Sequence, residues 1–211
     1  MRIRLLLVTA VVTALSVVLA ASPASAVTHS EAVSALLTAN EVGNRWHTVD
    51  ASRGSSGDLT GCESAQYARR GVDAKAKRAF RFGKSASFIT EKLTAFDTTR
   101  LARRDFRKSV ELFSACEEFT IDGTPFTVHR VNLGDFADQR AGFKIRGTVD
   151  RAGEFVPITF FLVTTRWGHQ IVATTMVVEG ALTGDQVRTV KASTVRVAKV
   201  ATEKVDNVLG R

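Results

Sequence analysis

A long run of apolar residues extends from residue 155 to residue 178 and is interrupted once, at residues 167–169. The residues on both sides of the interruption are mostly β-branched or aromatic, which favours two strands over a helix. Gly168 can adopt the positive φ of a tight turn, so the pattern predicts a β-hairpin with its turn within residues 166–170. Both faces of the first strand are apolar at residues 160–162, which indicates a central strand covered on both sides.

Other strands are predicted where charged and apolar residues alternate. Residues 76–82 and 88–96 show this alternation and are separated by a Gly-Lys turn, which predicts a second hairpin. Further strands are expected at residues 126–133 and around residues 143–147, before the central hairpin. Residues 51–60 are rich in serine and glycine and are expected to form a surface loop.

Helices are predicted from apolar periodicity and N-terminal caps. Thr28 and Thr38 each precede a glutamate by three residues, which is the spacing of a capping box. A longer helix is expected to begin at Thr98 or Thr99. The last helix is expected to be capped by Thr183 or Asp185 and to stop at Gly210. The core face of the longer helix is expected to contain Ala102, Phe106, Val110, Phe113 and Cys116. Short connections between successive strands then predict the α+β class, an antiparallel β-sheet covered by helices that lie mainly on one face.

The composition predicts one globular domain behind an export signal. The chain has 211 residues, of which 45% are hydrophobic and 24% charged. Residues 1–26 combine Arg2 and Arg4, an uncharged apolar stretch and the small residues Ala24-Ser25-Ala26, which is the pattern of a secretory signal peptide. Residues 27–211 are then expected to form a single secreted, extracellular domain with no membrane span.

The net charge of the chain suggests the class of molecule that it could bind. The formal net charge is +8 and falls to +6 without residues 1–26, which carry two arginines and no acidic residue. A basic secreted protein is attracted to anionic surfaces, such as phosphate-bearing wall polymers. The alternative interpretation is that this charge only keeps the protein soluble.

Two cysteines remain in the expected mature chain, Cys62 and Cys116. Two cysteines in an oxidising compartment predict one disulfide. A catalytic thiol is not expected, because the two residues form no C-x-x-C pair.

The sequence contains no catalytic or metal-binding motif that we could identify. H-E-x-x-H, S-x-x-K, P-loop and G-x-G-x-x-G patterns are absent from the chain. The four histidines, His29, His47, His129 and His169, have no helical pair spacing that would suggest a metal site. We therefore expect no enzyme activity, no cofactor and no metal ion.

Several short segments resemble one known family. These are Leu36-Leu37-Thr38 followed by Glu41-Val42-Gly43, the helix end Phe113-Ser114-Ala115-Cys116, and a late hairpin with a glycine turn before a terminal helix. Together they resemble the actinobacterial PknH-like extracellular sensor domain family. The resemblance implies an antiparallel sheet with helices around a groove, and a sensor role. Family members typically carry two disulfides where this chain can form one, and no kinase or lipid-anchor segment is expected within these residues.

We therefore expect a secreted, non-enzymatic binding or sensor-type domain that holds a ligand in a groove between sheet and helix. The ligand is expected to be a small or anionic extracellular molecule, with a cell-wall polymer as one candidate and nucleic acid not expected. The candidate ligand-binding residues are Trp46, Trp167, His169, Arg100, Arg103, Arg104 and Arg107. The alternatives are a secreted hydrolase with a dispersed active site and a cell-wall-associated structural protein.

Overall fold

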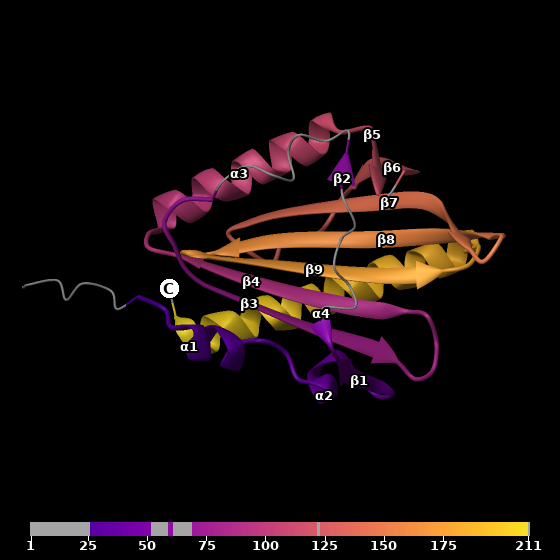
Figure 1. The fold of residues 1–211 in the computed structure, drawn as a ribbon. Helices are drawn as coiled ribbons and strands as arrows, with labels where there is room; N and C mark the ends of the chain where they lie inside the picture. Colours follow the sequence, from indigo (N-terminus) through magenta and orange to yellow (C-terminus); the bar gives the residue numbers. More distant parts are fainter. Residues whose placement is uncertain (1–25, 52–58, 61–68, 122, 211) are drawn as a thin grey trace, which may run out of the picture.

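The computed structural model describes residues 26–51, 59–60, 69–121 and 123–210. Within these residues the strands form one nine-stranded sheet in the order β1-β3-β4-β9-β8-β7-β6-β5-β2, and all neighbouring pairs are antiparallel (Figure 1). The strands are β1 Trp46–Val49, β2 Leu59–Thr60, β3 Val72–Phe82, β4 Phe88–Phe96, β5 Glu118–Ile121, β6 Thr124–Val131, β7 Gln139–Arg151, β8 Glu154–Trp167 and β9 Gln170–Glu179. The helices are α1 His29–Ser34, α2 Ala39–Val42, α3 Thr99–Ala115 and α4 Gly184–Leu209. The predicted α+β class with an antiparallel sheet is confirmed.

The central hairpin has the predicted form. Strands β8 and β9 pair from Ile158↔Glu179 to Trp167↔Gln170, so that Gly168 and His169 alone form the turn. Gly168 has a φ of 55°, which is the positive value that this first turn position requires. Strand β8 lies in the interior of the sheet, between β9 and β7, as the two apolar faces predicted.

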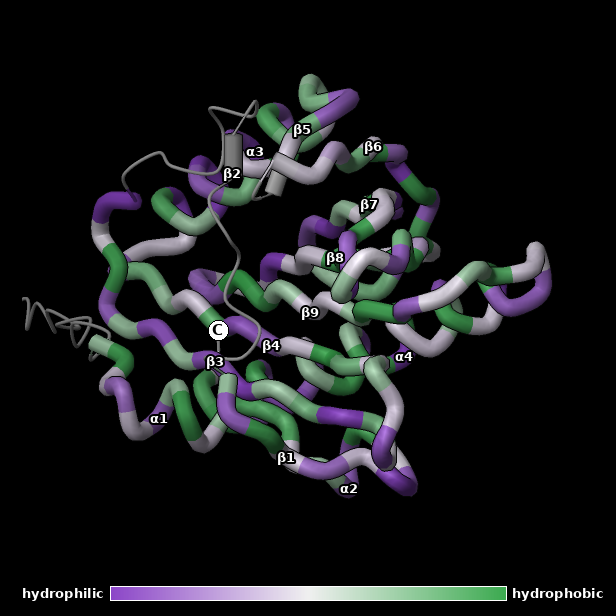
Figure 2. The backbone as a smooth tube through the Cα atoms, turned by 45° about the vertical axis from the view of Figure 1, so that its right-hand side comes forward, coloured by the Kyte–Doolittle hydropathy of each residue, from purple (hydrophilic) through white to green (hydrophobic). Residues whose placement is uncertain are grey.

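The two long helices cover opposite faces of the sheet. The core beneath α4 contains Val197 and Ala201 together with Phe80, Leu93 and Met176 of the sheet, and α1 and α2 join the same core. The core beneath α3 instead contains Phe106 with buried side chains of β6, β7 and β9. Figures 1 and 2 show α3 and α4 on different sides of the strands. The helices therefore do not all cover the same face of the sheet. Strands β8 and β9 are apolar on both faces, so both faces need a cover.

Side-chain caps begin the helices where the sequence indicated. Thr28, Thr38 and Thr183 each form a capping box with the residue three positions later. Thr98 caps α3, where its hydroxyl accepts the N–H of Leu101. In Figure 2 the tube of α4 alternates between hydrophilic and hydrophobic colours, as expected for a helix with one buried face. The buried face ends before Val208, which is 45% exposed.

The register of α3 is confirmed at Ala102 and Phe106, which are buried, but the helix also buries Asp105. Arg69 balances the charge of this buried acidic residue, because its Nε lies 3.4 Å from the Asp105 carboxylate. The sequence could not reveal this pair, because Arg69 and Asp105 are brought together only by the tertiary fold.

The disulfide in the predicted fold class needs correction. Cys62 lies outside the described residues, and no disulfide joins two of the residues that the structure describes. Cys116, which follows α3, is not a free thiol, and its Sγ also lies 3.5 Å from the carbonyl oxygen of Glu118. The part of the predicted fold class that the described residues establish is therefore the antiparallel sheet with its helices, and not the disulfide pairing.

Two other predictions also concern residues outside the described part. The proposed signal peptide lies at residues 1–26, of which only residue 26 is described, and most of the predicted loop at residues 51–60 is not described. The end of that loop differs from the prediction, because Leu59 and Thr60 form strand β2 against β5.

A mismatch in strand length leaves a notch in the sheet near α3. Strand β6 ends at Val131, which pairs with Gly142 of β7. Strand β7 begins three residues earlier, at Gln139, and residues 139–141 pair only with β8. The loop of residues 132–138 closes this notch, and its position brings it near both α3 and α4.

Candidate functional site

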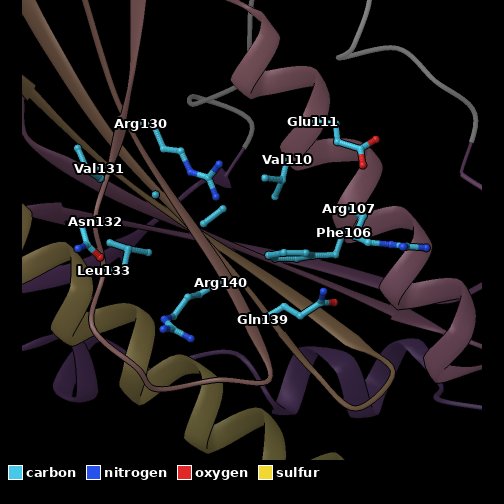
Figure 3. A pocket seen from close by; sticks show the side chains of 12 residues that line it. Phe106, Arg107, Val110, Glu111, Arg130, Val131, Asn132, Leu133, Gln139 and Arg140 are labelled. Carbon is cyan, nitrogen blue, oxygen red and sulfur yellow. The ribbon is translucent and has the colours of Figure 1, made fainter.

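A groove of about 780 Å³ lies between α3 and the notch in the sheet (Figure 3). We call it the α3 groove. The residues that line it are Phe106, Arg107, Val110, Glu111, Arg130, Val131, Asn132, Leu133, Gln139, Arg140, Ala141 and Gly142.

The helix wall of the α3 groove follows from helical periodicity. Phe106 and Val110 are four positions apart, as are Arg107 and Glu111, so the four residues share one side of α3. Phe106 is 4% exposed and forms part of the core, whereas Arg107 and Glu111 are exposed. The helix thus supplies an apolar floor and a charged rim.

The sheet wall follows from the alternation of side chains along the strands. Phe126 and Val128 of β6 are buried in the core beneath α3, so Arg130, two residues further on, points to the same face. In Figure 3 the Arg130 side chain extends into the space between β6 and α3. Arg140 is the second residue of β7 and has the opposite parity to Ala141, and Figure 3 shows its guanidinium group near α4. The notch therefore gives two strand arginines access to one groove from different sides.

The groove is more basic than acidic. Three arginines line it, Arg107, Arg130 and Arg140, against one carboxylate, Glu111. Arg140 also forms an ion pair with Asp135, whose side chain is 92% exposed. Guanidinium groups offer planar, forked donors that fit carboxylate and phosphate oxygens, so the groove can bind an anion.

The lining offers little for covalent or acid–base catalysis. No serine, threonine, cysteine or histidine is among the lining residues, and Glu111 is the single carboxylate. Nucleophilic catalysis requires a nucleophile beside a base, which the groove does not contain. No group of three or more His, Cys, Asp or Glu residues in the described ranges could hold a metal ion. The side chains that line the groove are thus cationic, amide and apolar groups, with one carboxylate.

The structure separates the candidate ligand-binding residues into several places. Arg107 lines the α3 groove, whereas Arg100, Arg103 and Arg104 are exposed on α3 and do not line it. The basic helix face that the sequence predicted is thus present and solvent-facing, and one member of it reaches the groove.

The two tryptophans lie at opposite ends of the sheet. Trp46 pairs with Phe82 at the end where β3 turns into β4, and their ring centroids are 5.2 Å apart. Trp167 borders the β8–β9 turn, and its Nε1 donates to Asp206 of α4 at 2.5 Å. The fold therefore does not bring Trp46 and Trp167 into one site.

His169 lies in the β8–β9 turn beside two carboxylates. Burial lowers the pKa of His169, and the charge of Asp73 opposes this effect. A hydrogen bond with Asp97 is the largest of the effects that raise the pKa of Asp73. The nearest ring contact of His169 is the Gln170 amide, 3.0 Å from its Nε2. His169 does not line the α3 groove.

The strand side of the groove was not predicted from the sequence; its residues are Arg130, Asn132, Gln139 and Arg140. One signal for Arg130 was present, because this residue continues the parity of Phe126 and Val128, where an apolar residue would complete the core face. An arginine at such a position indicates that the core ends and solvent begins. Arg140 carried no such signal, because its place depends on where β6 stops.

Comparisons with known proteins give the fold. No protein-family model and no curated protein matches the chain. Among solved structures, the extracellular domain of PknH from Mycobacterium tuberculosis superposes with a TM-score of 0.56. The match covers 83% of this chain and 99% of that chain. The chain has a PknH-like fold.

Sequence identity with the PknH extracellular domain is 15%. At this level the PknH-like fold is shared, but the side chains of the groove cannot be transferred from one protein to the other. The predicted resemblance in architecture is therefore confirmed. Within the described residues, moreover, none of the helices combines the length and apolar character needed to span a bilayer.

Proposed function

We propose that this chain is a non-enzymatic, sensor-type binding domain that acts outside the cell and holds an anionic ligand in the α3 groove. The observation that carries the proposal is the groove itself, where Arg107, Arg130 and Arg140 surround about 780 Å³ without a nucleophile and base pair. The PknH-like fold supports it, because the matching structure is an extracellular domain. The signal-peptide pattern of residues 1–26 supports the same location.

The groove has the features of a preformed site. Phe106, Leu133 and Ala141 are each no more than 5% exposed, so the floor is held by the core and not by mobile surface side chains. The cations stand above this apolar floor, where partial exclusion of water strengthens their attraction for an anion. A ligand with an anionic group and a compact apolar part fits both features.

The test measures binding of tripolyphosphate, a small polyanion, to the exported protein by isothermal titration calorimetry. The groove variant is Arg130→Gln/Arg140→Gln. The control is Arg100→Gln/Arg104→Gln, which removes the same charge from the exposed α3 face outside the groove. We expect the groove variant to weaken binding by about tenfold or more, and the control by about twofold or less.

Equal losses in the two variants would mean that only net charge attracts the anion, and would contradict the proposed site. An absence of tripolyphosphate binding by the wild-type protein would contradict it as well. Thermal unfolding of all variants, measured in parallel, shows whether a loss of binding reflects a loss of folded protein.

A further inference from the structure

A second hollow, of about 500 Å³, lies on the other side of the β6–β7 loop, against α4. We call it the α4 hollow. It is lined by Asn132, Leu133 and Gly134 of the loop and by Arg188, Lys191, Ala192, Val195, Arg196 and Lys199 of α4.

The α4 hollow adjoins the α3 groove. Asn132 and Leu133 line both spaces, so the two meet at the start of the β6–β7 loop. Leu133 is 5% exposed and packs with Val163 and Ala198, which fixes this junction to β8 and α4. Figure 3 shows Asn132, Leu133 and Arg140 next to α4, while Phe106 and Val110 belong to α3 on the far side.

The basic side chains of α4 face the hollow because of their spacing. Arg188, Lys191, Val195 and Lys199 recur at intervals of three and four residues, which places them along one side of the helix. From residue 188 to residue 199 this side extends over roughly 16 Å at 1.5 Å per residue. No acidic residue lines the α4 hollow.

Some of these cations already have contacts, and these contacts orient them. Arg196 donates to the Val42 carbonyl at 2.7 Å, and the Lys199 ammonium lies 5.3 Å from the centre of the Phe136 ring. Arg188 forms an ion pair with Asp185 one turn earlier, at the exposed start of the helix. Lys191 is half-buried between them, and no ion pair is described for it.

Taken together, the two spaces are lined by seven basic residues and one acidic residue. A small anion can reach the arginines of one space only, because the basic side of α4 alone is longer than such a ligand. A linear chain with repeated anionic groups can meet both sets and pass over Asn132 and Leu133 between them. Each contact then releases counterions from the chain, which is the main source of affinity in polyanion binding.

We propose that the α3 groove and the α4 hollow form one continuous binding path for a linear, phosphate-bearing polymer. This inference rests on the proposed function and names the ligand class for the same groove. Nucleic acid is the less favoured polyanion, because base binding uses exposed aromatic rings, and the only aromatic residue that lines either space is the buried Phe106.

The experiment compares two phosphate probes, tripolyphosphate and a long inorganic polyphosphate, on the exported protein. Lys191→Gln/Lys199→Gln tests the α4 hollow, and Arg130→Gln/Arg140→Gln tests the α3 groove. Arg100→Gln/Arg104→Gln remains the control with the same loss of charge. Binding is measured over a range of salt concentrations, with a melting temperature for each variant.

We expect Lys191→Gln/Lys199→Gln to weaken long polyphosphate by about tenfold and to lower the salt slope by roughly two, while tripolyphosphate changes by about twofold or less. The groove variant should weaken both probes. Poly(glycerol phosphate) and long polyphosphate are then compared at equal phosphate concentration. Tighter binding of poly(glycerol phosphate) identifies a wall-type polymer, and tighter binding of long polyphosphate identifies an inorganic one.

Different failures separate the two proposals. If the α4 variant leaves long polyphosphate unchanged while the groove variant weakens both probes, the continuous path is wrong and the proposed function stands. If the groove variant changes neither probe, the proposed function fails and the inference fails with it. Binding of single-stranded DNA as tight as that of polyphosphate, with the same dependence on Lys191 and Lys199, would replace the phosphate polymer by a nucleic acid.

Discussion

The carboxyl group of Glu91 on β4 accepts the backbone N–H of Leu37 at 2.8 Å inside the core beneath α4. Leu37 belongs to the short connection between α1 and α2, and Arg78 of β3 donates to the carbonyl oxygens of Val33, Leu36 and Leu37. Two ionisable side chains of the sheet thus hold one connection between helices. Glu91 is 0% exposed, and Oε1 has no hydrogen-bond partner among the described residues.

This contact predicts a stability that depends on pH. Burial raises the pKa of Glu91 from 4.5 to about 7, against the lowering effects of the Leu37 N–H, Arg78 and Lys204; nearby Glu41 raises it further. The folded state then holds a proton between pH 4.5 and about 7 that the unfolded state has released. Unfolding free energy should therefore fall as pH rises through this window, by about 3 kcal/mol from this group alone.

Glu91→Gln checks the assignment of that pH dependence. The amide cannot ionise but can still accept the Leu37 N–H, so the slope of stability between pH 5 and about 7 should become nearly flat. Urea unfolding at several pH values measures this slope for the variant and the wild-type protein. A slope in the variant equal to that of the wild-type protein would show that other groups cause the effect.

The buried guanidinium group of Arg166 predicts that a small substitution of its partner, Asp138, has a large effect on stability. Arg166 is 3% exposed, and Asp138 lies 3.2 Å from it and also accepts the Gly168 N–H. Asp138→Asn removes the balancing charge and should destabilise the protein by about 2 kcal/mol. Asp135→Asn in the same loop is the matched control and should cost less than about 1 kcal/mol, because Asp135 is 92% exposed.

Asp135→Asn also has a predicted effect on binding. Asp135 competes with a bound anion for Arg140, since the two side chains form an ion pair at the edge of the α3 groove. Removal of this carboxylate should strengthen tripolyphosphate binding by about twofold to fivefold, as expected for a surface pair. Calorimetry gives the change, and weaker binding would place the anion away from Arg140.

Gly147 on β7 predicts a packing requirement. A Cβ atom at this position would lie 2.4 Å from the Phe126 ring and 2.8 Å from the Pro125 carbonyl oxygen. Gly147→Ala should therefore destabilise the protein by about 1–3 kcal/mol through overpacking. Gly134→Ala is the control, because nothing lies within 4 Å of its Cβ position. Equal melting temperatures for the two variants would show that Phe126 moves aside freely.

Local features of the fold could be predicted because they depend on neighbouring residues. The β8–β9 hairpin follows from an apolar run and Gly168, and the caps at Thr28 and Thr38 follow from three-residue spacing. The order of the sheet could not be predicted, because β4 pairs with β9 across some 75 residues of sequence and no local pattern records such a pairing.

Of the ligand-binding residues proposed from the sequence, only Arg107 lines the α3 groove. A groove between sheet and helix with cations was expected, and Arg107 lies there. The contributions of Arg130 and Arg140 depend on β6 ending at Val131 while β7 begins at Gln139. Hydrophobic periodicity marks the existence of both strands but does not define their ends to within a few residues.

The positions of the shortest strands have a consequence for self-association. The sheet is bounded by β1, of four residues, and β2, of two residues, while the longest strands lie inside it. These two strands offer few free N–H and C=O groups to a strand of another molecule, and β8 and β9 lie between β7 and β4, away from either edge. The apolar β8–β9 hairpin is thereby kept from acting as a template for aggregation, which favours persistence of the protein at high concentration.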